Sequence, residues 1–136
     1  MDLKWLLHKN FRIAIYLDKW QGGAYVYSIS NGDLIGTAVL QPRKIKKVSY
    51  IELKSLYIKE KYRNIGLGSI LLQEILYFVK ERGFKGIIGH IMYTDSFKNI
   101  RRRLNFYRKN NAKIEIKEYR KTFNGKKVPV YVFLLT

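Results

Sequence analysis

Cysteine is absent from the sequence, and proline and histidine each occur only twice in 136 residues. Without cysteine the chain can form no disulfide, no thiolate metal site and no cysteine nucleophile. The two histidines, His8 and His90, lie too far apart for the usual spacing of metal ligands. We therefore expect no bound metal, and we expect each histidine to be structural or at the surface.

Long hydrophobic runs are missing as well. The apolar residues at the start contain Asp2 and Lys4 among them and stop after Leu7, which is too short for a signal peptide or a membrane span. We expect a cytoplasmic protein with no membrane association. The apolar content of 47% suffices for a core, and no linker or repeat interrupts the chain, so one domain is predicted over residues 1–136.

Acidic residues are scarce, since 27 Lys and Arg face 10 Asp and Glu, for a formal charge of +17. Such an excess favours an anionic partner, and nucleic acid, an acidic protein or a phosphorylated cofactor would each qualify. The cations are dispersed along the chain and form no disordered basic arm. They gather mainly at Arg43, Lys44, Lys46 and Lys47, at Arg101, Arg102 and Arg103, and at Arg120, Lys121, Lys126 and Lys127.

The first half of the chain has the patterns of strands. Alternating apolar residues predict a strand over 11–17, and two further strands, 24–29 and 34–40, flank an Asn31-Gly32 turn that is typical of a hairpin. Pro42 is expected to end the third strand and to begin a basic loop. The nearly continuous apolar run over 49–58 predicts a central strand, in which Glu52 and Lys54 are polar exceptions.

The second half mixes helices and strands. Apolar residues from Leu67 onward recur every three or four positions, which predicts an amphipathic helix capped by Gly83 and followed by a strand over 84–91. A strand-helix-strand unit of this kind is expected to be parallel and right-handed. A second helix is predicted around 97–107, with Asp95 or Ser96 as its N-cap, and a hairpin around Asn124-Gly125 is predicted to end the chain.

The segment 61–69, between the 49–58 strand and its helix, contains Gly66 and Gly68. Glycines let backbone N–H groups approach a ligand where a helix N-terminus leaves donors unpaired, so this turn can bind phosphate. The dinucleotide fingerprint lacks its third glycine, at Leu71, and no Gly-Lys-Ser/Thr of a Walker loop occurs. A sharp turn with no ligand is the alternative interpretation.

A resemblance to a known family favours the phosphate site. Arg63-x-x-Gly66-x-Gly68, after Leu56-Tyr57-Ile58 and before Leu71-Leu72, resembles the coenzyme A motif of the GNAT N-acetyltransferases. The segment 104–109 resembles the second signature of that family, and together the likeness spans about 48–116. It implies an α/β fold with a mixed, largely antiparallel sheet, a central parallel strand pair and flanking helices. It also implies acetyl-CoA as the co-substrate.

The resemblance assigns roles to particular residues. The backbone of Leu56 and Ile58 would pair with the pantetheine arm, and the 63–69 amides would hold the pyrophosphate. The implied cofactor-binding residues are Leu56, Tyr57, Ile58, Arg63, Asn64, Ile65, Gly66, Leu67, Gly68, Ser69 and, on the later helix, Asn99. Asn99 lies eight residues before Tyr107, whereas the asparagine of the family lies about seven before its tyrosine.

The same resemblance makes Tyr107 the general acid that protonates the departing CoA thiolate and Glu52 the general base that deprotonates the amine. Each has a plain alternative. Tyr107 could be a core aromatic on the apolar face of its helix, and Glu52 could form an ordinary ion pair with a neighbouring lysine.

One departure from the family concerns the acceptor. Only residues 18–23 separate the first predicted strand from the next, where relatives usually carry one or two helices. The acceptor side should therefore be open and basic, which suits an acidic or macromolecular amine. We expect direct acetyl transfer through a tetrahedral intermediate, by a monomer or homodimer. A basic nucleic-acid or ribosome-associated module with this fold and no transferase activity is the alternative, and nucleic acid is not favoured.

Overall fold

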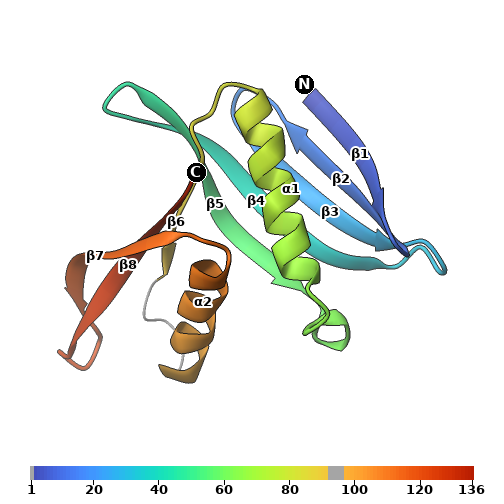
Figure 1. The fold of residues 1–136 in the computed structure, drawn as a ribbon. Coiled ribbons are helices and arrows are strands. Elements are labelled where there is room, and N and C mark those ends of the chain that lie inside the picture. The colour runs from blue at the N-terminus through green and yellow to red at the C-terminus, as the bar shows by residue number, and fades with distance from the viewer. Residues whose placement is uncertain (1, 92–96) are drawn as a thin grey trace. The chain divides into compact units, whose positions relative to one another are not determined.

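The computed structural model describes residues 2–91 and 97–136, and the chain divides into two compact units, Met1–Ile87 and Ile88–Thr136 (Figure 1). Each unit is described by itself. The predicted N-cap at Asp95 or Ser96 lies outside the described residues. The prediction of a single domain over residues 1–136 remains a prediction.

The first unit contains an antiparallel meander of five strands. These are β1 (Asp2–His8), β2 (Phe11–Leu17), β3 (Gly22–Ser28), β4 (Leu34–Ile45) and β5 (Val48–Ile58). The predicted strands over 11–17, 24–29, 34–40 and 49–58 all occur within these bounds or one residue from them. Short connections join neighbours because each hairpin needs only a tight turn.

Strand β1 was not predicted. Its backbone pairs with β2 from Asp2 opposite Leu17 to His8 opposite Phe11. Lys4 lies over the ring of Tyr77, which belongs to the helix over 67–81. Successive side chains of a strand point to opposite faces, so Trp5 lies on the other face, where it is 54% exposed. An edge strand with one exposed apolar row gives only a weak burial signal in the sequence.

The predicted break at Pro42 is wrong, because β4 continues to Ile45. Pro42 pairs with Ile51 of β5 and lies beyond the last β3 pair, Gly22 with Leu40. On the β3 side, Pro42 has no neighbouring strand among the described residues to which a backbone N–H could donate, so the N–H that proline lacks removes no hydrogen bond of the sheet. The turn that follows uses Lys46 and Lys47 at φ 47° and 68°.

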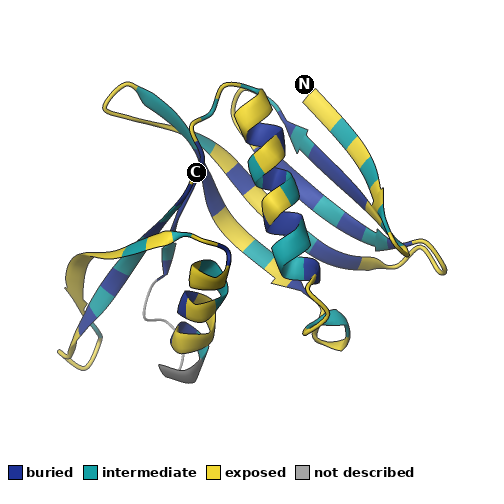
Figure 2. Cartoon of the chain, in the orientation of Figure 1, coloured by how far each residue is buried: buried dark blue, intermediate teal, exposed yellow. Residues whose placement is uncertain are grey.

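Helix α1 (Leu67–Glu81) packs against one face of this sheet and buries an apolar stripe (Figures 1 and 2). Its buried residues are Leu67, Leu71, Leu72, Ile75, Phe78 and Val79. Gly83, at φ 89°, ends the helix as predicted: its N–H donates to Lys80 O and the N–H of Phe84 donates to Val79 O. This pair of bonds is a Schellman cap.

The chain then returns alongside β5. Lys85 N donates to Ser49 O at 2.8 Å and Ile51 N donates to Gly86 O at 3.0 Å, so the two segments run in the same direction. The strand that begins here, β6 (Ile87–Ile91), starts three residues later than the predicted strand. The predicted strand-helix-strand unit and its parallel pairing are confirmed.

The second unit contains the rest of β6, helix α2 (Phe97–Lys109), β7 (Lys113–Lys121) and β8 (Lys127–Leu135). β8 lies between β6 and β7 and is antiparallel to β7. A Cβ on Gly89 of β6 would come within 2.3 Å of the Phe133 ring, so glycine is needed there for close packing. Eight strands, mostly antiparallel, and two α-helices in the described residues confirm the predicted fold class.

Candidate functional site

The connection between β5 and α1 has two left-handed residues. A short 3-10 turn, η1 (Glu60–Tyr62), is followed by extended backbone at Arg63, then by Asn64 at φ 64° and Gly66 at φ 82°. Asn and Gly tolerate this region better than other residues. A Cβ on Gly66 would meet nothing within 4 Å, so this glycine is required by its φ angle and not by crowding.

The start of α1 has backbone N–H groups that are not paired with any residue that the structure describes. The first helical bond is donated by Ile70 N to Gly66 O at 3.0 Å. Across residues 2–91 and 97–136, no hydrogen bond is donated by the N–H of Gly66, Leu67 or Gly68. The first turn contains no acidic residue, and Gly66 is exposed. Free amides at the positive end of a helix dipole suit an anion such as a pyrophosphate.

The direction of the β5 backbone follows from its pairing with β4. Lys59 N donates to Ile35 O of β4 at 2.8 Å. Along an antiparallel strand, the backbone N–H and C=O groups of successive residues point alternately toward the partner strand and away from it. The N–H and C=O groups of Tyr57 therefore point toward β4, and those of Leu56 and Ile58 point away from it. These are the two residues whose backbone the resemblance assigns to the pantetheine arm.

Arg63 makes three contacts inside the first unit. Its Nε donates to Ile58 O at 2.7 Å, and its N–H donates to Glu60 O at 3.1 Å. Its guanidinium carbon lies 5.4 Å from the centre of the Tyr57 ring. The amide of Arg63 is thus already paired, and the unpaired donors of the turn lie closer to the helix.

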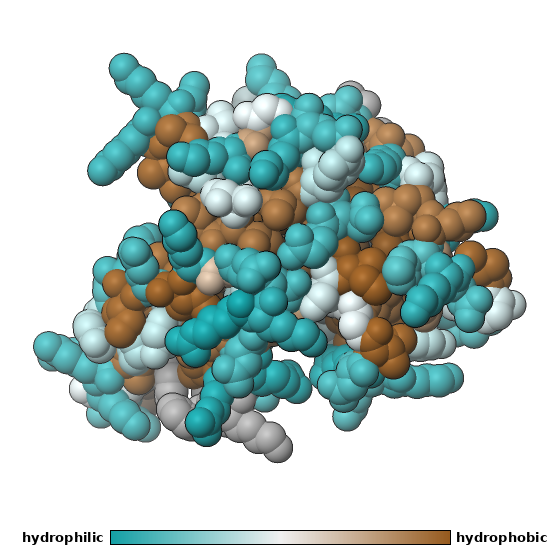
Figure 3. Space-filling view, in the orientation of Figure 1, coloured by the Kyte–Doolittle hydropathy of each residue, from teal (hydrophilic) through white to brown (hydrophobic). Residues whose placement is uncertain are grey.

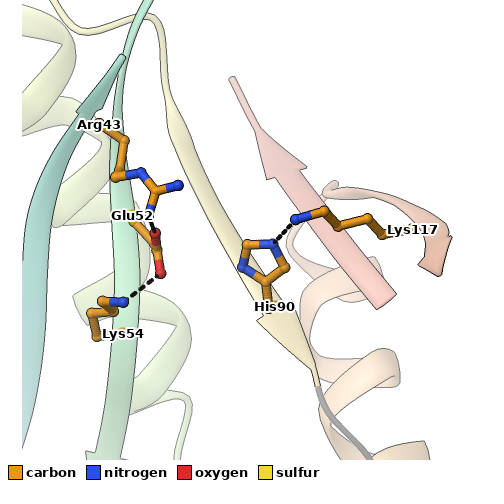
Figure 4. Close-up of polar contacts among 5 residues, drawn as sticks. All are labelled: Arg43, Glu52, Lys54, His90 and Lys117. Atoms are coloured by element: carbon orange, nitrogen blue, oxygen red, sulfur yellow. Dashed lines mark hydrogen bonds and ion pairs between the residues drawn. The ribbon is translucent and has the colours of Figure 1, made fainter. Parts of the chain in front are cut away.

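Glu52 is a buried carboxylate between two cations. Its side chain is 7% exposed, Arg43 Nη1 donates to Oε1 at 2.7 Å, and Lys54 Nζ lies 3.0 Å from Oε2 (Figure 4). Both cation side chains are 46% exposed. The ion pair that sequence reasoning gave as the alternative for Glu52 therefore exists, and its base role remains untested.

Tyr107 lies in the second unit on α2. Its ring stacks on Phe133 with centroids 3.8 Å apart, and Phe106 meets it edge-on at 5.1 Å. Burial raises the pKa of the Tyr107 hydroxyl to about 12, and the nearby charge of Arg103 opposes that rise. Tyr107 is therefore packed among aromatic side chains, which agrees with the alternative interpretation of Tyr107 as a core aromatic. Its hydroxyl stays protonated at neutral pH.

The other residues singled out from the sequence are spread over the second unit. Asn99 is half-buried on α2, and the cluster Arg101, Arg102 and Arg103 is exposed. His90 is half-buried, and its Nε2 lies 3.3 Å from Lys117 Nζ (Figure 4). The described residues contain no group of three His, Cys, Asp or Glu placed to hold a metal, and no helix long and apolar enough to cross a membrane.

The structure brings most of the predicted cofactor residues together on one stretch of the first unit, from Leu56 to Ser69. Tyr107 and Asn99 belong to the second unit. The bond from Arg63 to the Ile58 carbonyl was missed by sequence reasoning. The Arg43 contact of Glu52 was missed too, because it depends on β4 continuing past Pro42; a correct hairpin register would have placed Arg43 beside the 50–52 segment.

Several solved structures share this fold. A GNAT family acetyltransferase from Elizabethkingia anophelis with acetyl-CoA bound is 18% identical, with a TM-score of 0.65 over 93% of this chain and 97% of that one. Naa50 from Arabidopsis thaliana, in complex with the bisubstrate analogue CoA-Ac-MVNAL, is 20% identical, with a TM-score of 0.61 over 84% and 72%. NAA60 from the same plant, with a bisubstrate analogue, is 15% identical, with a TM-score of 0.64 over 85% and 75%.

The family assignment comes from a sequence match. No curated protein matches the sequence. The model of the acetyltransferase (GNAT) family, however, matches residues 3–111, well over half of the chain. This confirms the predicted resemblance and the predicted enzyme class, an acetyl-CoA-dependent acetyltransferase. The chain therefore belongs to the GNAT acetyltransferase family.

Proposed function

We propose that this protein transfers the acetyl group of acetyl-CoA directly to a primary amine, through a tetrahedral intermediate and without a covalent enzyme intermediate. The observation that carries the proposal is the set of unpaired N–H groups at Gly66, Leu67 and Gly68 at the start of α1, of which Gly66 is the exposed residue. These donors suit the diphosphate of coenzyme A. Similar structures with bound acetyl-CoA support the same co-substrate.

The backbone of β5 supplies the next part of the proposed cofactor site. The C=O of Leu56 and the N–H of Ile58 point away from β4, and an amide-containing pantetheine arm could pair with them as an added strand does. Holding the thioester by this pairing would supply proximity, which is the main source of rate in a direct transfer.

Tyr107 is the proposed hydrogen-bond donor to the leaving thiolate. A phenol with a pKa of about 12 is protonated throughout the physiological range, so it is always ready to donate a hydrogen bond. Complete transfer to a thiolate whose acid has a pKa of ~8.5 would be uphill by about 5 kcal/mol. We therefore assign Tyr107 the role of stabilising the developing thiolate by hydrogen bonding, with full protonation completed by solvent.

Glu52 is the proposed general base. It is a buried carboxylate in a mostly apolar strand, and its contacts with Arg43 and Lys54 hold it in place. A carboxylate is a weak base for an ammonium, so it would act through water on an amine that reaches the site already neutral.

The acceptor is proposed to be an acidic or macromolecular amine. Residues 18–21 are all that join β2 to β3, and Asp18 Oδ1 closes this turn by accepting from the N–H groups of Trp20 and Gln21, both at 2.8 Å. In this fully described connection, no helix is inserted between β2 and β3 along the chain. The bisubstrate analogue bound by Naa50 contains the peptide MVNAL, which supports a peptide amine as the class to test first.

Calorimetric titration with coenzyme A, followed by mass spectrometry of candidate acceptors incubated with acetyl-CoA, tests the proposal. We expect saturable coenzyme A binding and a gain of one acetyl group on an amine. Absence of coenzyme A binding, combined with tight, salt-dependent binding of RNA or DNA, would contradict it and favour a binding module.

A further inference from the structure

The contact between Arg63 Nε and the Ile58 carbonyl suggests a role for this arginine other than binding phosphate. The Ile58 carbonyl lies at the end of β5 and points away from β4, because Lys59 N, one residue later, donates to Ile35 O of β4. It is therefore the next acceptor along the strand edge after the Leu56 carbonyl. Arg63 occupies it at 2.7 Å.

The rest of Arg63 is also fixed within this segment. Its N–H closes η1 by donating to Glu60 O, and its guanidinium lies over the Tyr57 ring at 5.4 Å. One residue thus joins the end of β5, the 3-10 turn and the start of the loop that presents the free amides. The left-handed residue Asn64 follows it directly, and the second one, Gly66, lies two residues after Asn64.

We infer that Arg63 is a positioning residue: its Nε holds the Ile58 carbonyl and so sets the distance between the β5 edge and the amides at the start of α1. This inference rests on the proposed function, since it concerns how a pantetheine arm paired with β5 would continue to a diphosphate at Gly66. With the Ile58 carbonyl occupied, pairing along β5 must stop at the Ile58 N–H, and the ligand must turn there toward the loop.

Three substitutions of Arg63 distinguish the effect of its Nε–H donor from the effect of its positive charge. In Arg63→Gln the side-chain N–H is attached to Cδ, the same bond position as the arginine Nε, but the charge is lost. In Arg63→Lys the charge remains, but a carbon takes the Nε position. Arg63→Met removes both. Lys59→Gln, an exposed neighbour that loses one charge without touching the strand edge through its side chain, is the matched control.

The first measurement is calorimetric binding of coenzyme A and of pantetheine, which lacks the phosphates. We expect Arg63→Gln and Lys59→Gln to bind both ligands within about twofold of wild type, whereas Arg63→Lys and Arg63→Met weaken both by about tenfold. The inference is overturned if Arg63→Lys binds like wild type and Arg63→Gln loses coenzyme A affinity only, because Arg63 would then be a phosphate ligand.

The second measurement, hydrogen exchange of the 59–66 amides without ligand, needs no cofactor binding. We expect exchange to be about tenfold faster in Arg63→Lys and Arg63→Met and unchanged in Arg63→Gln. Equal exchange in all three variants overturns the inference. If wild type fails to bind coenzyme A, the proposed function fails, and the exchange data still decide whether Arg63 holds the strand end.

Discussion

Tyr107 shows how packing changes the chemistry of a single residue. Its ring lies 3.8 Å from the Phe133 ring, and burial raises its pKa to about 12. Packing of the ring and the proposed role of the hydroxyl are therefore compatible, because the ring makes the aromatic contacts and the proposed role needs only the oxygen. The two roles separate when only the oxygen is removed.

Tyr107→Phe keeps the stacked ring and removes the hydroxyl. We expect turnover to fall by about 100-fold or more, because a hydrogen-bond donor to the charge that develops in the transition state contributes at that level. Coenzyme A affinity should stay within about twofold, as measured by calorimetry. Tyr119→Phe, at an exposed position of the same unit, serves as the control. Unchanged turnover would remove Tyr107 from the mechanism.

The raised pKa of Tyr107 also predicts a stability change at high pH. The folded state keeps the proton up to about pH 12, and the unfolded state loses it near pH ~10, so the folded state is stabilised less and less as the pH rises from 10 to 12. Urea unfolding at pH 9 and 11 should show a smaller loss of stability for Tyr107→Phe than for wild type. Equal losses would show that the hydroxyl is not buried.

Glu52→Gln separates the base from the ion pair. The charge change leaves Arg43 and Lys54 without their shared partner, and because both are half-exposed we expect a loss of only about 1–2 kcal/mol in the free energy of unfolding. If Glu52 is the base, turnover should fall by about 100-fold or more as well. Arg43→Gln is the control, and a stability loss with normal turnover would leave Glu52 only a structural role.

At the scale of elements, α1 begins and ends with glycines of the same geometry. Gly66 and Gly83 lie at φ 82° and 89°, and a Cβ at either would meet nothing within 4 Å. Alanine at either position should therefore cost about 1–2 kcal/mol of folding free energy through backbone strain alone. Denaturant unfolding of the two single variants measures this cost.

Only one of these two glycines borders the proposed diphosphate site. Gly66→Ala should also weaken coenzyme A binding by about tenfold, because a strained turn moves the free amides at the start of the helix, whereas Gly83→Ala should leave the affinity unchanged. Equal affinities in the two variants would mean that the 63–69 turn is only a connection.

The elements also show where local sequence is a sufficient guide. The period of α1 and the left-handed positions at Gly32, Gly66 and Gly83 follow from side-chain pattern and backbone sterics, so they were predictable. The continuation of β4 past Pro42 was not, because a proline is tolerated there only since antiparallel β3 begins at Gly22, opposite Leu40, and does not reach Pro42. Strand β1 was missed because its apolar residues Leu3, Trp5 and Leu7 remain exposed, so its pairing with β2 is not signalled by burial.

At the scale of the whole molecule, the net charge of +17 should act on the acceptor. Hydrophilic side chains cover much of the face in Figure 3, with hydrophobic patches between them. We expect acidic peptides to be acetylated with a higher kcat/KM than neutral peptides of equal length. That advantage should fall by about tenfold between low and high salt, because screening removes long-range attraction. A salt-independent preference for a neutral metabolite would contradict the proposed acceptor class.

The sequence by itself determined the family, the order of most helices and strands, and the Gly66 turn at the start of α1, because each depends on residues close together in the chain. The tertiary structure decided which groups remain available. Register with β4 turns the Leu56 and Ile58 backbone outward, Arg63 takes the Ile58 carbonyl, and burial sets the pKa of Tyr107. Hydrogen-bond direction and desolvation depend on neighbours distant in sequence, which no local pattern specifies.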